Sequence, residues 1–410
     1  MKIANLETML INPPLAARNA DQKVRFSGID TQTIYKVTTD NGITGYGDSR
    51  GHSPMSEAQI NGFIDRSPFD FINADLPTGL FAALYDAMGK YLEVPAYKLM
   101  GQKVRSRVPV SAWTRPGSPE DLAAEVQRAA GEGYLIFKVH TCEQYDVLEQ
   151  NRAVEDVAPL GFKMHYDFNH NRPSVAVLRL IQELEKSPVV GFLEDPLKSQ
   201  DIDGWRRLRE KTFLPILMHV PQLGGGPEIM HGCADLYMVG EMGIATSIRR
   251  GFAAAEANAS TVIQLTGGTL SKAMAMHLGA ILPNVSHSNN LDDQYDEDVT
   301  GGRLEITEGF SPVPEGPGLG VEVDEDILAR LAAIPKTEIP RHVGILYLAG
   351  GHKYYTPSTP SVSGLTGFLE GNIRGLRTKI WDDDGSEEFA RIYERVQREG
   401  TFATIDGQSV

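Results

Sequence analysis

The chain has 410 residues, with 39 Lys and Arg against 54 Asp and Glu, which gives a formal net charge of −15 with histidine neutral. This acidic balance argues against nucleic acid or an anionic membrane as a partner, because both need a basic surface. A composition of 41% hydrophobic and 23% charged residues argues against a disordered chain. The two cysteines, Cys142 and Cys233, cannot build a disulfide framework, so we expect a cytoplasmic protein. The sequence shows no signal-peptide pattern and no apolar run long enough for a membrane span.

Residues 1–105 are predicted to form a small α+β domain. Residues 31–39 are rich in β-branched and aromatic side chains, and the Asp40-Asn41-Gly42 turn signal that follows predicts a hairpin. Residues 80–101 carry apolar side chains at helical spacing, and the helix is expected to stop near Pro95.

Residues 106–315 repeat a short apolar strand followed by an amphipathic helical segment. Seven or eight such units in this stretch favour a closed barrel of parallel strands over an open sheet. The candidate strands are 108–112, 135–140, 163–167, 190–194, 216–219, 236–239, 261–264 and a weaker one near 285.

Residues 316–410 begin with a segment rich in Gly and Pro that leads into an acidic helix start. The tail from about 341 onward is rich in Gly, Ser and Thr, with one helical piece near 387–398. We expect this tail to make subunit contacts or to wrap the surface, and the alternative is a second lid over a site.

Polar side chains end four consecutive predicted strands of the barrel, where barrel enzymes hold their chemistry. Lys138 and His140 end the second strand and point the same way, because side chains alternate along a strand. Asp167 ends the third strand, Glu194 the fourth and His219 the fifth. The first two carboxylates can meet across one cation, and such hard oxygen ligands suit Mg²⁺. Each residue alone is more often a helix cap or a rim residue, and only the ordered series favours a site.

At these residues the chain resembles the enolase superfamily and, within it, the mandelate racemase and muconate lactonizing enzyme branch. The resemblance covers about residues 30–325. It is carried, in the family's order, by GITGYGDS, FKVH, YDFNH, FLEDP and PEGPGLGVEVDEDIL. It implies a (β/α)₇β TIM-like barrel with an α+β capping domain built from the N-terminal region and part of the C-terminus.

The resemblance also implies a shared chemistry. A base takes the proton α to a carboxylate, and a divalent metal, Mg²⁺ in the family, stabilises the resulting enediolate. Asp167 and Glu194 match the first two metal ligands, and Lys138 matches the family's barrel lysine. Loops near residues 15–30 and at His52 are implied to close on the substrate, and Asn169 is a further expected substrate contact.

The chain departs from the family pattern at several positions. His140 stands where a second lysine is usual, and His219 stands where the third carboxylate ligand is usual. Histidine is a better ligand for Zn²⁺, Mn²⁺ or Fe²⁺ than for Mg²⁺. Glu241 on the next strand could compensate as a ligand or contact the substrate. The seventh strand, VIQLTGG, offers no histidine, which disfavours racemisation because that reaction needs two opposed bases.

Three functions stay open. The first is a dehydratase for a sugar acid, in which Lys138 or His140 removes the α-proton and His170 protonates the departing β-hydroxyl. The second is an epimerase or cycloisomerase that uses the same first step. The third is a pseudoenzyme that keeps the fold and binds a metal or ligand without turnover. The expected partner is a small-molecule carboxylate, and a symmetric homo-oligomer is the default assembly.

Overall fold

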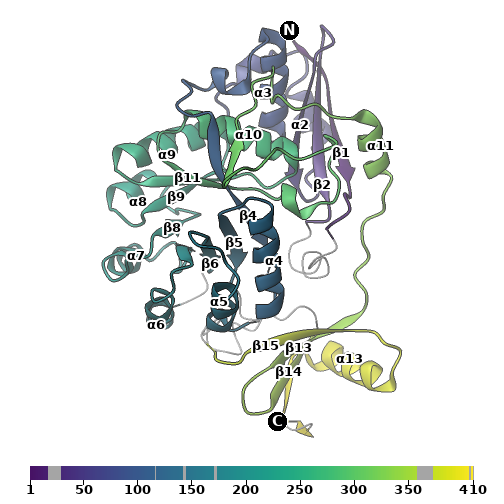
Figure 1. The fold of residues 1–410 in the computed structure, drawn as a ribbon. Helices are drawn as coiled ribbons and strands as arrows, with labels where there is room; N and C mark the ends of the chain where they lie inside the picture. Colours follow the sequence, from purple (N-terminus) through teal and green to yellow (C-terminus); the bar gives the residue numbers. More distant parts are fainter. Residues whose placement is uncertain are drawn as a thin grey trace.

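The computed structural model describes residues 1–16, 29–115, 117–141, 145–169, 173–357, 373–405 and 408–409. Figure 1 shows three parts, which are an N-terminal sheet with helices, a barrel, and a second antiparallel sheet with one helix near the C-terminus. Within the described ranges, no helix is long and apolar enough to cross a membrane.

The N-terminal sheet is antiparallel and packs against one long helix. Its strands, in spatial order, are β1 (Ile3–Ile11), β2 (Gln32–Thr39) and β3 (Thr44–Arg50). The predicted turn joins β2 to β3, and Gly42 has the positive φ of 82° that such a turn uses. The helix α3 (Thr78–Leu92) lies so close to β3 that a Cβ on Gly47 would overlap the carbonyl oxygen of Gly79. The sheet therefore needs glycine at this contact. Short elements surround it: α2 (Glu57–Asn61), η1 (Pro68–Phe71) and η2 (Ala96–Leu99).

Eight parallel strands form the central barrel, and β11 pairs with both β10 and β4 to close it. The strands are β4 (Arg107–Thr114), β5 (Ile136–His140), β6 (Lys163–Asp167), β7 (Val190–Glu194), β8 (Ile216–Met218), β9 (Leu236–Gly240), β10 (Ser260–Gln264) and β11 (Val285–Asn289). The helices that follow the first seven are α4 (Pro119–Gly131), α5 (Val147–Glu155), α6 (Ser174–Leu184), α7 (Ile202–Arg209), α8 (Gly226–Met230), α9 (Ile244–Glu256) and α10 (Thr269–Ile281). The predicted (β/α)₇β barrel with an α+β cap is confirmed.

The strand register brings the polar strand ends together. His140 of β5 pairs with Asp167 of β6, and Asp167 pairs with Glu194 of β7. Because the strands are parallel, these three side chains stand at the same edge of the barrel. The η3 turn (Asp292–Gln294) follows β11, and the short β12 (Phe310–Pro312) runs antiparallel beside β4.

The capping region docks on the barrel through a buried carboxylate. Asp48 of β3 accepts hydrogen bonds from the backbone N–H groups of Gly268 and Ser271, both at 2.8 Å. These groups open α10, where the helix dipole favours negative charge. Burial, followed by the nearby charge of Asp298, raises the pKa of Asp48 to about 7. The helix α11 (Glu325–Ala332) returns to the capping region and packs beside β1.

A separate sheet and helix, called the C-terminal unit here, are formed by the described residues from 342 onward. The strands follow the spatial order β15 (Arg377–Asp382), β13 (His342–Tyr347), β14 (His352–Thr356), β16 (Phe402–Ile405) and β17 (Gln408–Ser409). The predicted helix near 387–398 is α13 (Glu387–Glu399). Val343, Phe389 and Val396 belong to an apolar cluster distinct from that of the barrel. The sequence analysis did not predict these strands; charged residues interrupt the apolar pattern of two of them, β14 and β15.

Candidate active site

A cavity of about 250 Å³ opens at the carboxyl ends of the barrel strands. The residues predicted from the sequence that line it are His140, Asp167, Asn169, His219 and Glu241. Side chains that the sequence did not single out also line it, among them Arg50, Trp113, Arg115, Asn289 and Asn290. Residues from the cap and from several strands thus share one polar pocket.

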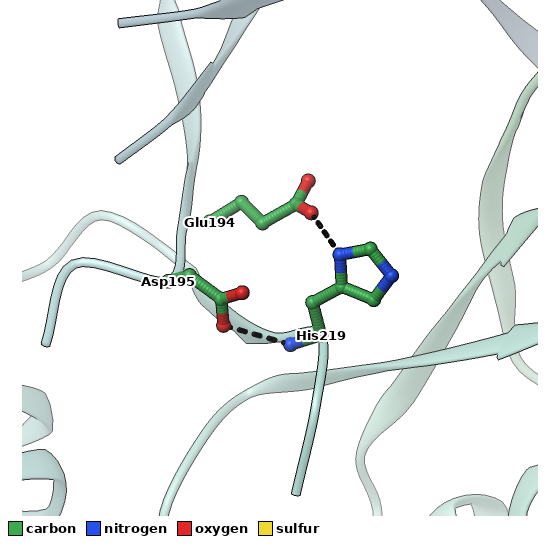
Figure 2. A group of neighbouring side chains, drawn as sticks. All are labelled: Glu194, Asp195 and His219. Carbon is green, nitrogen blue, oxygen red and sulfur yellow. Dashed lines mark hydrogen bonds and ion pairs between the residues drawn. The ribbon is translucent and has the colours of Figure 1, made fainter. Parts of the chain in front are cut away.

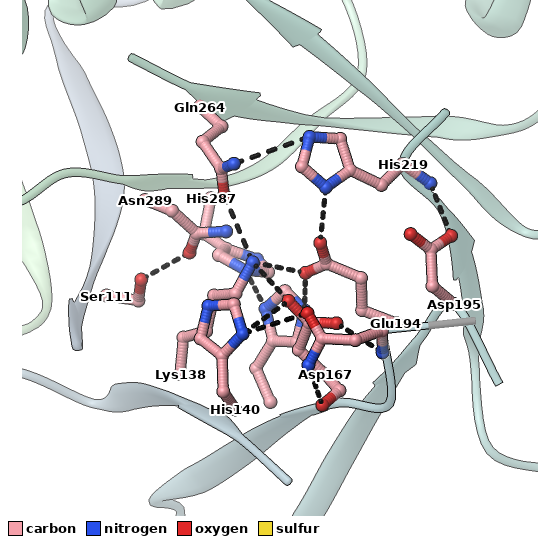
Figure 3. Close-up of polar contacts among 12 residues, drawn as sticks. Ser111, Lys138, His140, Asp167, Glu194, Asp195, His219, Gln264, His287 and Asn289 are labelled. Carbon is pink, nitrogen blue, oxygen red and sulfur yellow. Dashed lines mark hydrogen bonds and ion pairs between the residues drawn. The ribbon is translucent and has the colours of Figure 1, made fainter. Parts of the chain in front are cut away.

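Lys138 lies beneath this cavity, fully enclosed by acidic and amide groups. Its Nζ is 2.6 Å from Glu194 Oε2, 3.1 Å from Asp167 Oδ2 and 3.0 Å from Gln264 Oε1 (Figure 3). Its side chain is only 1% exposed. Burial disfavours the ammonium form, but the charges of Glu194 and Asp167 outweigh it and raise the pKa of Lys138. Lys138 therefore remains a cation that bridges the two carboxylates.

Asn169 determines which ring nitrogen of His140 carries the proton. The Asn169 Nδ2 donates to the Asp167 carbonyl oxygen at 3.3 Å, which turns its Oδ1 toward His140 Nδ1 at 3.0 Å. Since an amide oxygen only accepts, this network assigns the proton to Nδ1 and the lone pair to Nε2. Burial lowers the pKa of His140 to about 3. The charge of Asp167, whose Oδ2 lies 3.5 Å from His140 Nδ1, opposes this shift, and the charge of Arg115 adds to it. The ring is therefore neutral at physiological pH.

His219 lies in the opposite electrostatic environment. Its Nδ1 is 2.9 Å from Glu194 Oε1, and its Nε2 is 3.5 Å from Glu241 Oε2. Burial alone would lower its pKa, but these two carboxylates raise the pKa of His219 to about 10. The same contact shifts the pKa of Glu241 in the opposite direction. Burial would raise this pKa, yet His219 and the hydroxyl of Thr266 lower it to about 2.

Two buried histidines inside the barrel were missed by the sequence reading. His165 Nε2 lies 2.6 Å from Glu194 Oε2, and His165 Nδ1 lies 2.9 Å from His287 Nε2. His287 Nδ1 in turn meets the Ser286 hydroxyl at 3.0 Å. This series of contacts, from Ser286 through His287 and His165, holds Glu194 in position from inside the barrel. His165 was readable in the sequence, because it sits two residues before Asp167 and so shares its face of β6.

Two arginines supply positive charge to the cavity. Arg50 comes from the end of β3 in the capping region, and Arg115 follows β4. The Arg115 guanidinium lies over the Trp113 ring, 5.1 Å from its centroid. A chain with a net charge of −15 therefore presents local positive charge where an anion would enter.

One group of side chains could hold a metal ion. Glu194, Asp195 and His219 offer ligand atoms that all lie within 4.8 Å of one another (Figure 2). Asp195 was not predicted as a ligand; its Oδ1 also accepts the His219 backbone N–H at 2.9 Å. Two carboxylate oxygens and one imidazole nitrogen are atom types that bind divalent cations in proteins. Asp167, the remaining predicted ligand, lies outside this group and faces Lys138 instead.

Two further predicted residues do not join the cavity as described. His52 is exposed and lies outside the cavity lining. His170, the predicted acid, falls outside the described residues.

Residues 121–327 match the family model described as enolase C-terminal domain-like. The chain belongs to this family. The model is that of the mandelate racemase and muconate lactonizing enzyme branch of the enolase superfamily. The predicted family membership is therefore confirmed.

Relatives with known names include D-galactonate dehydratases. The chain is 27% identical over 353 residues to the one from Variovorax paradoxus (strain S110), covering 73% of this chain and 91% of that protein. It is 24% identical over 347 residues to the one from Ralstonia pickettii (strain 12J), covering 72% and 89%.

Solved structures share the fold. An N-succinyl Arg/Lys racemase from Bacillus cereus ATCC 14579 has a TM-score of 0.68 and 22% identity, covering 82% of this chain and 99% of its own. A mandelate racemase/muconate lactonizing family protein from Azoarcus sp. EbN1 has a TM-score of 0.67, 22% identity and the same coverage. At this identity, the likeness extends to the fold alone.

Proposed function

We propose that the protein is a metal-dependent hydro-lyase that dehydrates a sugar acid, with His140 as the base. The observation that carries the proposal is a neutral imidazole that lines the cavity and has its lone pair on Nε2. The similarity to D-galactonate dehydratases over most of their length supports the substrate class.

In the proposed reaction, His140 Nε2 takes the proton from the carbon next to the substrate carboxylate. The hydroxyl on the following carbon leaves as water once it is protonated, and the resulting enol rearranges to a 2-keto-3-deoxy acid. A bound carboxylate would raise the pKa of His140 toward the working pH, because a nearby negative charge favours imidazolium. The product therefore equals the substrate less one molecule of water, and the reaction needs no oxidant or reductant.

Lys138 is a poor candidate for the base. Its ammonium is enclosed by two carboxylates and an amide oxygen, and its pKa is raised. Removing its proton would leave Asp167 and Glu194 without their counter-charge in a buried site. We propose instead that Lys138 keeps these two side chains in position.

We propose that Arg115 and Arg50 hold the carboxylate end of the substrate. Arginine recognises carboxylates through paired N–H donors, and both side chains line the cavity. D-galactonate is the first substrate to test, since it names the activity of the relatives.

A divalent cation is proposed at Glu194 and His219, with Asp195 or Asp167 as the further oxygen ligand. Its binding would displace a proton from the His219 imidazolium, because only a deprotonated ring nitrogen coordinates a metal. Such a cation would stabilise the negative charge that develops when the α-proton is removed. Mg²⁺ is implied by the family, while the His219 nitrogen favours Mn²⁺, Fe²⁺ or Zn²⁺. His170 stays the proposed acid for the departing hydroxyl.

The test is a sugar-acid panel, led by D-galactonate, incubated with the purified chain and each of Mg²⁺, Mn²⁺ and Zn²⁺. A 2-keto-3-deoxy product that requires added metal supports the proposal. Deuterium uptake at the α-carbon from D₂O without elimination would point to an epimerase instead. If no product forms and no deuterium is taken up with any of these metals, both enzyme functions are refuted.

Binding without turnover is the second candidate, and one observation favours it. The Lys138 ammonium fills the space between Asp167 and Glu194, so the chain itself supplies a cation there. Metal titration by calorimetry separates the two. Absence of divalent-metal binding, together with sugar-acid binding and no product, would support the pseudoenzyme.

A further inference from the structure

The C-terminal unit docks on the start of helix α5. Arg374 Nη1 lies 2.9 Å from Asp146 Oδ1, and the backbone N–H of Gly375 donates to Asp146 Oδ2 at 3.1 Å. Arg377 Nη2 lies 2.9 Å from Glu149 Oε2 in the first turn of the same helix. The side chain of Asp146 is only 2% exposed, so this ion pair is largely shielded on the acidic side.

Asp146 serves two structures at once. Its Oδ1 caps α5 by accepting the backbone N–H groups of Leu148 at 2.9 Å and Glu149 at 3.4 Å. The same carboxylate receives Arg374 and Gly375 from the C-terminal unit. Because one group holds both, the start of α5 cannot shift without breaking the contact to the C-terminal unit.

The start of α5 is joined to the two strands that carry proposed site residues. Asp146 follows His140 in the connection from β5 to α5. The Gln150 side chain on α5 donates to the Gly117 carbonyl oxygen at 2.7 Å, just beyond Arg115 at the end of β4. Asp146 and Gln150 thus join the start of α5 to the connections that follow His140 and Arg115.

We propose that the C-terminal unit is a positioning element for the active site. Arg374 is the positioning residue, and it acts through Asp146 on the start of α5 and thus on His140 and Arg115. The roles of His140 and Arg115 rest on the proposed function, whereas the contact at Asp146 does not. The two claims can therefore fail separately.

The experiment compares the full-length chain with Arg374→Ala, Arg374→Lys and a matched control, Arg341→Ala. Arg341, which directly precedes the C-terminal unit, is also exposed, and it pairs with Asp383 of that unit rather than with the barrel. Hydrogen–deuterium exchange is measured by mass spectrometry on peptides covering 145–150, and kcat and KM are measured on a sugar acid. These peptides report the α5 start whether or not the chain turns over.

We expect Arg374→Ala to raise exchange at 145–150 severalfold and to raise KM severalfold while lowering kcat, with Arg341→Ala unchanged. Arg374→Lys keeps the charge and should restore part of both effects. A mere loss of folded protein would lower kcat and leave KM unchanged.

Two results would contradict a positioning role for Arg374. Exchange and KM equal to those of Arg341→Ala would overturn the proposal. Increased exchange with unchanged KM and kcat would show a structural contact and refute a positioning role. If the wild-type chain shows no turnover, increased exchange still supports the contact at Asp146, and only the proposed function has failed.

Discussion

At the scale of single residues, the two cavity histidines differ in charge because their neighbours differ. His140 lies near one carboxylate, Asp167, and near the cations Arg115 and Lys138, so burial dominates and lowers its pKa to about 3. His219 lies between Glu194 and Glu241, which raise its pKa to about 10 despite burial. Groups whose pKa values are driven apart in this way suit different roles in one reaction.

The lowered pKa of His140 predicts the pH dependence of turnover. A base must be unprotonated, and a lowered pKa keeps His140 neutral until strongly acidic pH. We therefore expect kcat/KM, measured at saturating metal, to show no fall attributable to His140 between about pH 5 and pH 8. An acidic limb near the ordinary histidine value, about 6.5, that disappears in His140→Gln with residual activity would contradict this assignment. Circular dichroism at each pH controls for unfolding.

The His219 position predicts a change in metal preference. His219→Asp replaces a nitrogen donor with a hard oxygen and adds a negative charge, both of which favour Mg²⁺. We expect Mg²⁺ to bind about tenfold tighter or more, on the scale at which changes around a metal alter affinity. His219→Asn is the matched control without the charge. Calorimetric titration showing equal Mg²⁺ affinity in all three proteins would rule out His219 as a ligand.

At the scale of elements, the junction between β3 and α10 holds the cap on the barrel through Asp48. Its carboxylate is buried, and its pKa is raised from 3.8 to about 7. A carboxyl group with a raised pKa in the folded state favours folding in its protonated form. Its contribution is therefore complete below about pH 4 and is lost as the pH rises through about 7.

The raised pKa of Asp48 predicts that the stability of the fold decreases as the pH rises. Between pH 5 and pH 7, the free energy of unfolding should fall relative to Asp48→Asn, by up to about 1.4 kcal/mol per pH unit. Asp48→Asn also disturbs the bonds to Gly268 and Ser271, so the slope rather than the absolute stability is compared. Urea unfolding at several pH values measures it, and parallel slopes for the two proteins would count against a raised pKa.

Much at this scale was predictable from the sequence, for a physical reason. Parallel strands align their carboxyl ends, so the order of Lys138, His140, Asp167, Glu194 and His219 predicted a shared site edge. What each residue contacts was not predictable, because it depends on partners from other strands. The bridging of two carboxylates by Lys138 is one example. The contribution of Arg50 is another, since it reaches the cavity from a different domain and belongs to no readable motif.

At the scale of the whole molecule, the barrel and the C-terminal unit have separate apolar clusters. Their described ion pairs are Arg374 with Asp146 and Arg377 with Glu149, and both arginines are about 45% exposed. Solvent-exposed pairs contribute about 0–1 kcal/mol each, and the pair at Asp146 differs in that its carboxylate is buried. The division into 1–105, 106–315 and 316–410 stays a proposal, as does a homo-oligomeric assembly.

A truncated chain tests this independence. We expect residues 1–340 to keep the barrel and to unfold cooperatively, because the main apolar cluster contains no side chain from the C-terminal unit. Its KM should rise as in Arg374→Ala, since both remove the contact at Asp146. Circular dichroism melting and light scattering measure the outcome. An aggregated or unfolded product would show that the C-terminal unit is required for folding.

The most direct test of the central claim is one proton NMR experiment in D₂O. D-galactonate is incubated with wild-type chain and a diamagnetic metal, Mg²⁺ or Zn²⁺, and His140→Gln is the parallel sample. The account predicts loss of the α-proton signal with formation of a 2-keto-3-deoxy acid in the wild type, and a rate lower by about 10²- to 10⁴-fold in the variant. Equal rates in the two samples would contradict His140 as the base. If D-galactonate and the rest of the sugar-acid panel stay unchanged with metal-loaded wild type, the claim of a dehydratase is wrong.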